Sequence, residues 1–206
     1  MNIVIIGAGV AGLGTAIRLA SKGHSVQVFE ANVYPGGKLT SIQLGDYRFD
    51  AGPSLFTMPH LVEELLQLSP KKVPFSHIEK QIVCNYFFHD QTRFTAFADK
   101  QKYLEEAHKV LGADPKKLYE YFENAKKKYE YTAPLFLERS LHKAHTYWSG
   151  NTFKAILNSS QLHLNENLDA VNRRLLGNNH KLIQVFNRYA TYNGSSPYHT
   201  PGIMSM

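Results

Sequence analysis

Cysteine is almost absent from this chain. Cys84 is the one cysteine among 206 residues, so no disulfide can form within the chain. This excludes a small secreted scaffold stapled by disulfides and favours a reducing compartment, which predicts a cytoplasmic protein. Because Cys84 lies in an apolar stretch, we expect it to be a small buried hydrophobic side chain rather than a redox thiol.

Long hydrophobic runs are also lacking. The most apolar run, residues 3–17, has 15 residues and contains four glycines. A helix needs about 20 apolar residues to cross a bilayer, so no transmembrane helix is predicted. No basic residue precedes the run and no small-residue cleavage site is evident, so a secretory signal peptide is not predicted either.

Motifs of hydrolytic and metal chemistry are missing as well. The chain has no G-x-S-x-G nucleophile elbow. It has ten histidines, of which His142 and His145 are three residues apart, but no third ligand follows at a spacing typical of zinc. We therefore predict no metal site and no catalytic triad, and the catalytic residues stay unassigned.

The charge that is present divides the chain. The net charge is +6, yet residues 1–70 carry four Lys/Arg against five Asp/Glu, whereas residues 71–206 carry nineteen against twelve. We predict a domain boundary near residue 70. A basic second part fits nucleic acid, an anionic membrane surface or simply a solvated surface. No stacking-aromatic motif or known nucleic-acid fold accompanies the charge, so no nucleic-acid partner is expected.

Hydrophobic periodicity predicts an α/β protein that begins with a βαβ unit. Residues 1–6 and 25–30 have the pattern of buried strands, and residues 10–22 have helical spacing. Further strands are predicted over 39–44, 47–49, 75–78, 83–88 and 93–98. Further helices are predicted over 59–68, 165–176 and 181–192, and from Asp114-Pro115 onward with Leu118, Phe122, Ala125 and Tyr129 as the apolar stripe.

A glycine-rich turn joins the first strand to the first helix. It reads Gly7-Ala8-Gly9-Val10-Ala11-Gly12, a GxGxxG, and Glu30 ends the second strand. In such a turn the first glycine permits the tight bend, the second lets the backbone approach a pyrophosphate, and the third allows the helix to pack closely. The helix N-terminus would hold the phosphates. Glu30 would accept hydrogen bonds from ribose hydroxyls and repel a 2′-phosphate, which disfavours NADP.

The residues that follow point to FAD rather than NAD. Glu30-Ala31 is followed within seven residues by Gly36-Gly37-Lys38, whose backbone amides and cation would face the same pyrophosphate. Residues 3–41 resemble the glutathione-reductase-type FAD fold in its amine-oxidase and carotenoid-desaturase branch, where a glycine pair followed by Arg or Lys closes over the cofactor. The resemblance implies FAD. Lysine in place of the commoner arginine keeps the charge but loses the bidentate fork.

Two more stretches carry a closer resemblance. Residues 47–59, YRFDAGPSLFTMP, resemble the FD-x-GPS/T segment of phytoene and hydroxycarotenoid desaturases. Their sequence is more similar to that of the hydroxycarotenoid 3,4-desaturases. Residues 186–198 resemble the same family's RYATY-x-G-x-x-PY segment. The resemblance implies an FAD-dependent enzyme of carotenoid biosynthesis that removes two hydrogens from phytoene or a hydroxycarotenoid. It also implies that residues 1–70 form the first part of an FAD domain and 71–206 part of a substrate and membrane-facing domain.

The family resemblance suggests further site residues. It places Gly52, Pro53 and Ser54 near the flavin end of the cofactor, where the residues alone predict only a turn. Phe56 and Met58 suit a channel for a polyene, or equally a hydrophobic core. For Arg188, Tyr189 and Tyr192 we favour a helix end capped at Gly194 over direct catalysis.

A carotenoid must be taken from a bilayer, so the resemblance implies a peripheral membrane protein. Lys126-Lys127-Lys128 and residues 133–137 are the candidate contacts, since each basic residue near an anionic leaflet contributes about 1 kcal/mol. The alternative for the lysine run is an exposed helix face.

Two rival interpretations remain at this point. Family members run to more than twice this length, and nothing after Tyr198 resembles the return of the chain that completes their FAD domain. The chain would then be a non-catalytic, truncated FAD-binding portion that binds FAD weakly or not at all. Within the enzyme class, the nearest rival is a flavin amine oxidase or an isoprenoid reductase. The sequence leaves the exact carotenoid, the electron acceptor and the oligomeric state open.

Overall fold

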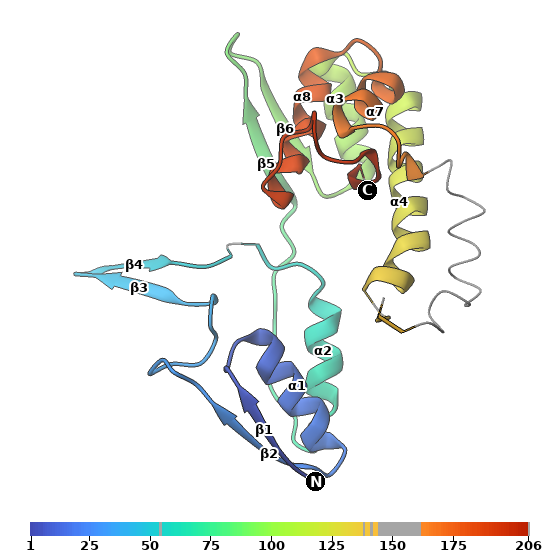
Figure 1. Ribbon diagram of the computed structural model, residues 1–206. Helices are drawn as coiled ribbons and strands as arrows, with labels where there is room; N and C mark the ends of the chain where they lie inside the picture. The colour runs from blue at the N-terminus through green and yellow to red at the C-terminus, as the bar shows by residue number, and fades with distance from the viewer. Residues whose placement is uncertain (54, 138, 141, 144–161, 206) are drawn as a thin grey trace. The chain divides into compact units, whose positions relative to one another are not determined.

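The computed structural model describes residues 1–53, 55–137, 139–140, 142–143 and 162–205. The chain forms two compact units, which we call unit 1 (Met1–Glu79) and unit 2 (Lys80–Met206) (Figure 1). Within the described ranges, no helix is both long enough and apolar enough to cross a bilayer.

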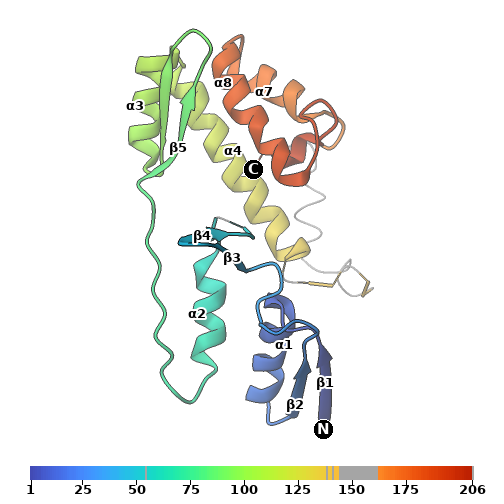
Figure 2. The same ribbon diagram turned by 90° about the vertical axis from the view of Figure 1, so that its left-hand side faces the viewer.

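Unit 1 begins with the predicted βαβ unit. Strands β1 (Asn2–Ile6) and β2 (Ser25–Phe29) are parallel, with Ile3 opposite Val26 and Ile5 opposite Val28. Helix α1 (Val10–Ser21) connects them and packs along the pair, as Figures 1 and 2 show. This confirms the Rossmann-type α/β interpretation of the N-terminal residues.

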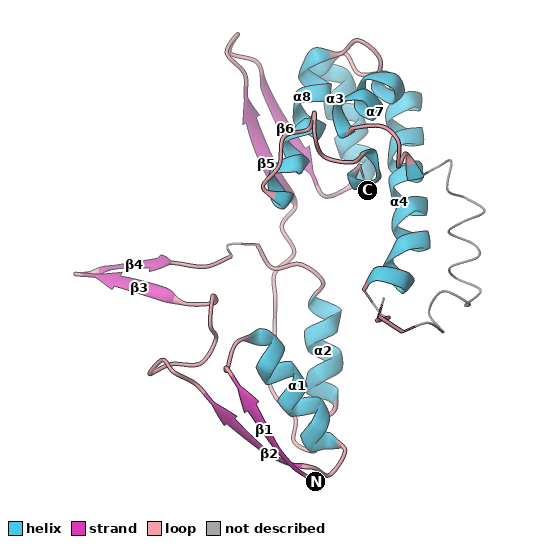
Figure 3. Cartoon of the chain, in the orientation of Figure 1, coloured by secondary structure: helices cyan, strands magenta, loops and turns pink. Residues whose placement is uncertain are grey.

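A hairpin and a second helix follow in unit 1 (Figure 3). Strands β3 (Ser41–Leu44) and β4 (Tyr47–Asp50) pair antiparallel around the predicted turn, and helix α2 spans Pro59–Gln67. The prediction of a strand over residues 75–78 is wrong, because this segment has no strand partner in the described part of the chain. Its Phe75 ring instead packs edge-on against Phe56 at 5.9 Å between ring centroids.

Unit 2 combines a hairpin with four helices among its described residues. Strands β5 (Ile82–Phe87) and β6 (Arg93–Phe97) form the predicted antiparallel hairpin. The helices are α3 (Lys100–Leu111), α4 (Pro115–Phe136), α7 (Leu168–Leu176) and α8 (His180–Asn187). Each begins after an Asp or Asn whose side chain accepts a backbone N–H, which satisfies one of the free donors of the first turn. The N-cap predicted at Asp114 is among them.

The core of unit 2 lies where β6, α3, α4 and α8 meet. Aromatic rings dominate it, and neighbouring rings pack at centroid distances of 4.5–6.4 Å. The fully or nearly fully buried members include Phe94, Leu104, Leu118, Tyr121, Leu182 and Phe186. Edge-to-face and tilted packing of this kind contributes beyond the burial of area alone.

The buried face of α4 differs from the predicted stripe. Leu118 is buried as expected, but Tyr129 is 45% exposed, and Tyr121 and Lys128 face the core instead. Lys128 is only 2% exposed, and its ammonium donates to Ser205 Oγ and to the Gly202 carbonyl. The lysine run is therefore not one exposed face, because Lys128 lies two turns after Tyr121 on the buried side.

The C-terminal helices are shorter than predicted. Helix α7 starts at Leu168, three residues later than expected, because Asn167 caps it. The predicted helix over 181–192 is divided into α8 and a 3₁₀ helix, η2 (Arg188–Asn193). The helix end at Gly194 is confirmed: this glycine has φ +62 and donates its N–H to the Thr191 carbonyl.

Candidate functional site

The glycine-rich turn of unit 1 leaves no room for side chains. Gly7 has φ +98 and donates its N–H to the Phe29 carbonyl at 2.6 Å, which ties the turn to the end of β2. A Cβ placed on Gly12 would lie 2.0 Å from the Gly7 carbonyl oxygen. Helix α1 therefore crosses the turn at a distance that only glycine allows, as in dinucleotide-binding βα turns.

The second glycine pair lies directly against this turn. Gly36 donates its N–H to the Ala8 carbonyl at 2.8 Å and forms a bridge with Gly9. Gly37 has φ +61, and a Cβ on it would approach the Gly9 Cα to 3.2 Å. The structure thus brings together the two glycine segments that the sequence separates by more than twenty residues.

Gly52 extends the same cluster of backbone segments. A Cβ on Gly52 would lie 1.9 Å from the carbonyl oxygen of Lys38, so the segment Gly52–Pro53 runs against the residues that follow the glycine pair. Beside it is a pocket of about 340 Å³ lined by Leu39, Thr40, Ser41, Arg48, Asp50, Gly52 and Pro53. Ser54 lies outside the described residues.

Glu30 is held beside the glycine-rich turn by its own hydrogen bonds. One carboxylate oxygen accepts the Ala8 N–H at 2.7 Å, and the other accepts the backbone and side-chain N–H groups of Asn32 at 2.9 Å. These bonds, that from the Asn32 backbone first and that from Ala8 next, lower the pKa of Glu30 below its ordinary value. The result is a fixed carboxylate, ionised at neutral pH, at the edge of the turn.

The remaining predicted positions in unit 1 lie on its surface. Val10, Ala11, Ala31 and Lys38 are exposed. Phe56 is 56% exposed and its ring contacts Phe75 and His77, while Met58 adopts a left-handed backbone (φ 54) as the N-cap of α2. Neither side chain is part of a buried core.

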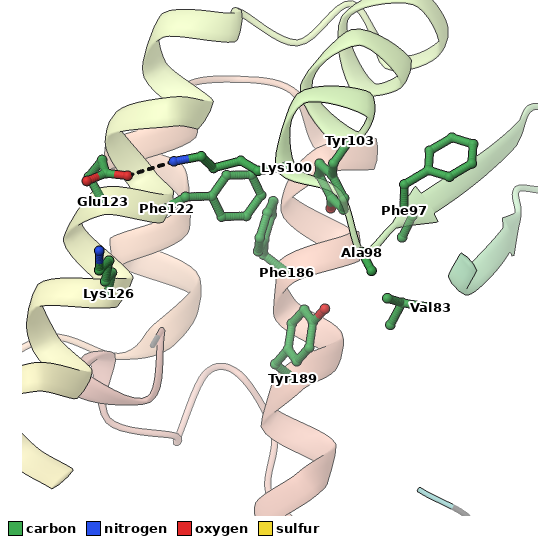
Figure 4. A pocket seen from close by; sticks show the side chains of 11 residues that line it. Val83, Phe97, Ala98, Lys100, Tyr103, Phe122, Glu123, Lys126, Phe186 and Tyr189 are labelled. Carbon is green, nitrogen blue, oxygen red and sulfur yellow. Dashed lines mark hydrogen bonds and ion pairs between the residues drawn. The ribbon is translucent and has the colours of Figure 1, made fainter. Parts of the chain in front are cut away.

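Unit 2 has an apolar pocket that sequence reasoning did not find. It encloses about 360 Å³ between the β5–β6 hairpin, α3, α4 and α8, and Figure 4 shows its lining. Aromatic rings of Tyr103, Phe122, Phe186 and Tyr189 form much of its wall, and an ion pair between Lys100 and Glu123 (2.9 Å) lies at its rim. Burial raises the pKa of the Tyr103 phenol, whose hydroxyl has no hydrogen-bond partner among the described residues. Size and lining are those of a site for an apolar ligand.

The sequence indicated only some of the residues that line this pocket. Phe122 belonged to a predicted apolar stripe, and Phe186 and Tyr189 to a family motif. Nothing in the sequence indicated that Tyr103 of α3 would meet them, because that contact depends on how the helices cross.

Metal chemistry finds no support among the described residues. His142 lies within them and His145 outside. In this described part of the chain, no three His, Cys, Asp or Glu side chains converge. Cys84 is half-buried in β5.

One family model matches a part of the chain within the first unit. The family described as NAD(P)-binding Rossmann-like domain matches residues 5–68. These residues contain the glycine-rich turn, Glu30 and the second glycine pair.

Curated relatives match almost the whole chain. A 1-hydroxycarotenoid 3,4-desaturase of Flavobacterium sp. (strain P99-3) is 53% identical over 204 residues, 98% of this chain. A 4,4'-diapolycopene oxygenase of Methylomonas sp. is 29% identical and a 4,4'-diaponeurosporene oxygenase of Staphylococcus aureus (strain MRSA252) is 27% identical, each over 100% of this chain. The chain spans 41% of the length of each of these relatives. The predicted resemblance to carotenoid desaturases is confirmed.

Among solved structures, a crystal structure of a Pyrococcus furiosus protein has a similar fold. The TM-score is 0.52 at 15% sequence identity, over 98% of this chain and 40% of that chain. This likeness concerns the fold alone.

Proposed function

Since this chain is similar to a carotenoid desaturase over 98% of its length, we propose that the protein is an FAD-dependent oxidoreductase that desaturates a carotenoid. One observation carries the proposal. The backbone of Gly12 lies so close to that of Gly7 that no side chain fits between them, and the Glu30 carboxylate is fixed beside this turn. This is a dinucleotide cradle in a chain 53% identical to an enzyme named for a hydroxycarotenoid. The lower identities to the oxygenases, 29% and 27%, favour desaturation over oxygenation.

The residues of unit 1 fit FAD. The turn formed by Gly7, Ala8, Gly9, Val10, Ala11 and Gly12 would hold the pyrophosphate at the α1 N-terminus. Gly36, Gly37 and Lys38 would close over it, followed by Gly52, Pro53 and Ser54. Glu30 and Ala31 would bind the adenosine ribose. The Glu30 carboxylate already accepts three N–H groups of the chain, and a carboxylate has about four acceptor sites, so about one remains for a ribose hydroxyl.

This placement assigns different roles to FAD and to the residues of the chain. FAD, when bound, supplies the acceptor for the hydride equivalent removed from the substrate. The chain's own residues bind and orient the cofactor through backbone groups, and the apolar pocket of unit 2 excludes water from the polyene part of the substrate. No side chain is assigned a proton-transfer role.

The pocket of unit 2 is the proposed substrate surface. Its aromatic wall, formed by Tyr103, Phe122 and Phe186, offers contact to an extended conjugated chain, and its 360 Å³ accommodates part of one. Phe56 and Met58, on the surface of unit 1, are proposed as further apolar contacts. Apart from Phe56 and Met58, residues 1–70 then serve the cofactor, and residues 71–206 serve the substrate.

A peripheral membrane contact belongs to the same proposal. Lys126, Lys127, Phe136 and Leu137 are all exposed, the last two by 55% and 60%. Exposed lysines about two and a half to three turns before exposed apolar side chains at the end of the same helix suit an anionic leaflet. Lys128 is not part of this surface because it is buried.

Expression in a bacterial host that accumulates a 1-hydroxycarotenoid tests the proposal. We expect a product with one more conjugated double bond, seen as a shift of absorption to longer wavelength, and flavin absorption in the purified protein. A host that accumulates the corresponding carotenoid without the hydroxyl group is the matched control for substrate class. Absence of both flavin and product in a folded protein would reject the proposal.

A further inference from the structure

The Arg188 side chain in unit 2 contacts two aromatic rings. It is the first residue of η2, and its guanidinium carbon lies 5.2 Å from the ring centre of Tyr86 and 5.4 Å from that of Tyr189. Cation–π contacts of this kind stabilise a cation at the ring face. They hold the guanidinium in place without neutralising its charge.

The charge of Arg188 has no counter-ion in the described part of the chain. Among the described residues, its buried Nε has no hydrogen-bond partner and no carboxylate lies within ion-pair distance of the group. The neighbouring arginines of α7 differ: Arg173 pairs with Asp169 at 2.6 Å and Arg174 with Glu166 at 2.8 Å. Nε itself is out of reach of a ligand, but a partly buried guanidinium charge without a carboxylate partner is costly, so an anion from outside the described residues is expected at the part of the group that lines the pocket.

The guanidinium lies at a pocket of cationic and aromatic character. This pocket encloses about 710 Å³ beside α8, and among its lining side chains are His89, Arg173, His180 and Tyr198. The described residues that line it include no Asp or Glu. The two nearby carboxylates are already engaged, Asp169 by Arg173 and Asn187, and Asp90 by Lys181.

We propose that this pocket binds a phosphate-type oxyanion through Arg188. The planar fork of an arginine matches the oxygens of a phosphate in a bidentate contact, which the point charge of a lysine cannot reproduce. The imidazoles of His89 and His180 are further donors, and the aromatic wall provides contact for an organic group attached to the phosphate. The pocket is lined by residues of unit 2 and shares none with the proposed cofactor cradle of unit 1, so this proposal does not depend on the proposed function.

Calorimetric titration of the full chain with inorganic phosphate at low ionic strength tests the site. We expect Arg188→Gln to weaken phosphate binding at least about tenfold. Arg188→Lys should fall between this variant and the wild type, because it keeps the charge and loses the fork. Arg18→Gln removes the same charge from an exposed position in unit 1 and should leave the affinity unchanged.

Two further controls separate the possible results. Circular dichroism reports whether Arg188→Gln folds, and Arg188→Lys carries the test if it does not. Gly12→Ala, which obstructs the cofactor cradle, should leave this phosphate site intact, so that failure of the cradle is distinguishable from failure of the pocket. Equal phosphate affinity in the wild type and both Arg188 variants overturns the proposal.

The phosphate could be free in solution or part of a lipid headgroup, and vesicles distinguish these sources. The probe is co-sedimentation with phosphatidylglycerol vesicles. Loss of vesicle binding by Arg188→Gln together with loss of phosphate binding identifies a headgroup site. Loss of phosphate binding alone identifies a site for a soluble phosphate compound.

Discussion

Unit 1 and unit 2 use their apolar residues in opposite ways. In unit 2, side chains such as Phe94, Leu118 and Leu182 are 0–1% exposed and form a continuous core. In unit 1, Ala8 is the one apolar side chain buried to a comparable degree among the described residues, while Ile6 and Ile78 are 89% and 85% exposed. Unit 2 is held by packing, whereas unit 1 is held mainly by local backbone geometry.

This difference explains why a sequence motif identifies unit 1 and no comparable motif identifies unit 2. Backbone requirements leave a trace in the sequence as glycines at fixed spacing, so unit 1 is identified by its motif. Packing leaves a more diffuse trace, because many combinations of apolar residues fill a core. A unit with little buried apolar surface also gains more, relative to its own stability, from a ligand that binds only the folded state.

The largest expected effect of a single substitution is in the glycine-rich turn. Gly12→Ala would place a Cβ 2.0 Å from the Gly7 carbonyl oxygen, a contact with backbone that cannot rotate away. We expect complete loss of FAD binding and of hydrogen-exchange protection in β1 and α1. Unit 2 should keep its protection, because its core does not include this turn.

Gly14→Ala is the matched control in the same helix. A Cβ there would lie 3.5 Å from Leu65 Cδ1, an ordinary van der Waals contact. Alanine also favours a helix interior over glycine by about 1 kcal/mol, so this variant should be as stable as the wild type or more so. Equal damage from both substitutions would show that the close approach at Gly12 does not decide the fold of unit 1.

The next largest effect is expected from deleting a leucine side chain in unit 2. Leu182→Ala removes a side chain that is 1% exposed, and we expect the free energy of unfolding to fall by about 3 kcal/mol. Leu44→Ala in β3 of unit 1 removes the same atoms from a side chain that is 61% exposed, and should cost less than about 0.5 kcal/mol. Chemical denaturation followed by circular dichroism measures both. Similar costs for the two variants would contradict the contrast between the units.

The sequence predicted the βαβ unit and the β3–β4 hairpin of unit 1 and helices α4, α7 and α8 of unit 2, because these elements rest on local rules. The glycine spacing, the hairpin at β3–β4 and the N-cap at Asp114 follow from residue type within a few positions. The strand prediction for residues 75–78 was wrong because a tertiary contact, not a local rule, decides the conformation there. The apolar residues have the pattern of a strand, but the Phe75 ring packs against Phe56.

The candidate sites divide in the same way. Gly12, Gly36 and Glu30 were predicted as cofactor residues, and the structure brings their segments together. The apolar pocket and the environment of Arg188, which has no carboxylate partner among the described residues, could not be predicted, because Tyr103 and Tyr86 reach them from other elements. Likewise, a lysine run indicates an exposed face, and only tertiary packing shows that Lys128 is buried.

Lys128 makes the stability of unit 2 depend on pH. Burial lowers the pKa of its ammonium group to about 8, well below the ordinary value of 10.5. Between about pH 8 and 9.5 the unfolded chain therefore binds more protons than the folded one, so stability should rise with pH, by at most about 1.4 kcal/mol per pH unit. Above this window the buried tyrosines, whose pKa values are raised, oppose the trend.

Lys128→Met tests this assignment, since methionine fills a similar space without a charge. The variant should lose the rise in unfolding free energy between pH 8 and 9.5, measured by urea denaturation at each pH. Lys127→Met, on the exposed side of the same helix, should keep it. A pH dependence that is unchanged in Lys128→Met would exclude this lysine as its source.

Substitution of Glu30 is expected to have the smallest effect on stability but a clear effect on FAD binding. Its lowered pKa means that the folded state favours the carboxylate, so the stabilisation is present above about pH 4.5 and is lost as the pH falls. Glu30→Gln keeps one acceptor oxygen for the Ala8 N–H but removes the charge that orients the ribose hydroxyls. We expect FAD affinity to fall about tenfold in a flavin fluorescence titration, with little change in unit 1 protection. Asp46→Asn, at the exposed β3–β4 turn, removes an equal charge and should leave the affinity unchanged. If both variants weaken FAD binding alike, the effect is one of net charge, and the Glu30 carboxylate does not contact the ribose.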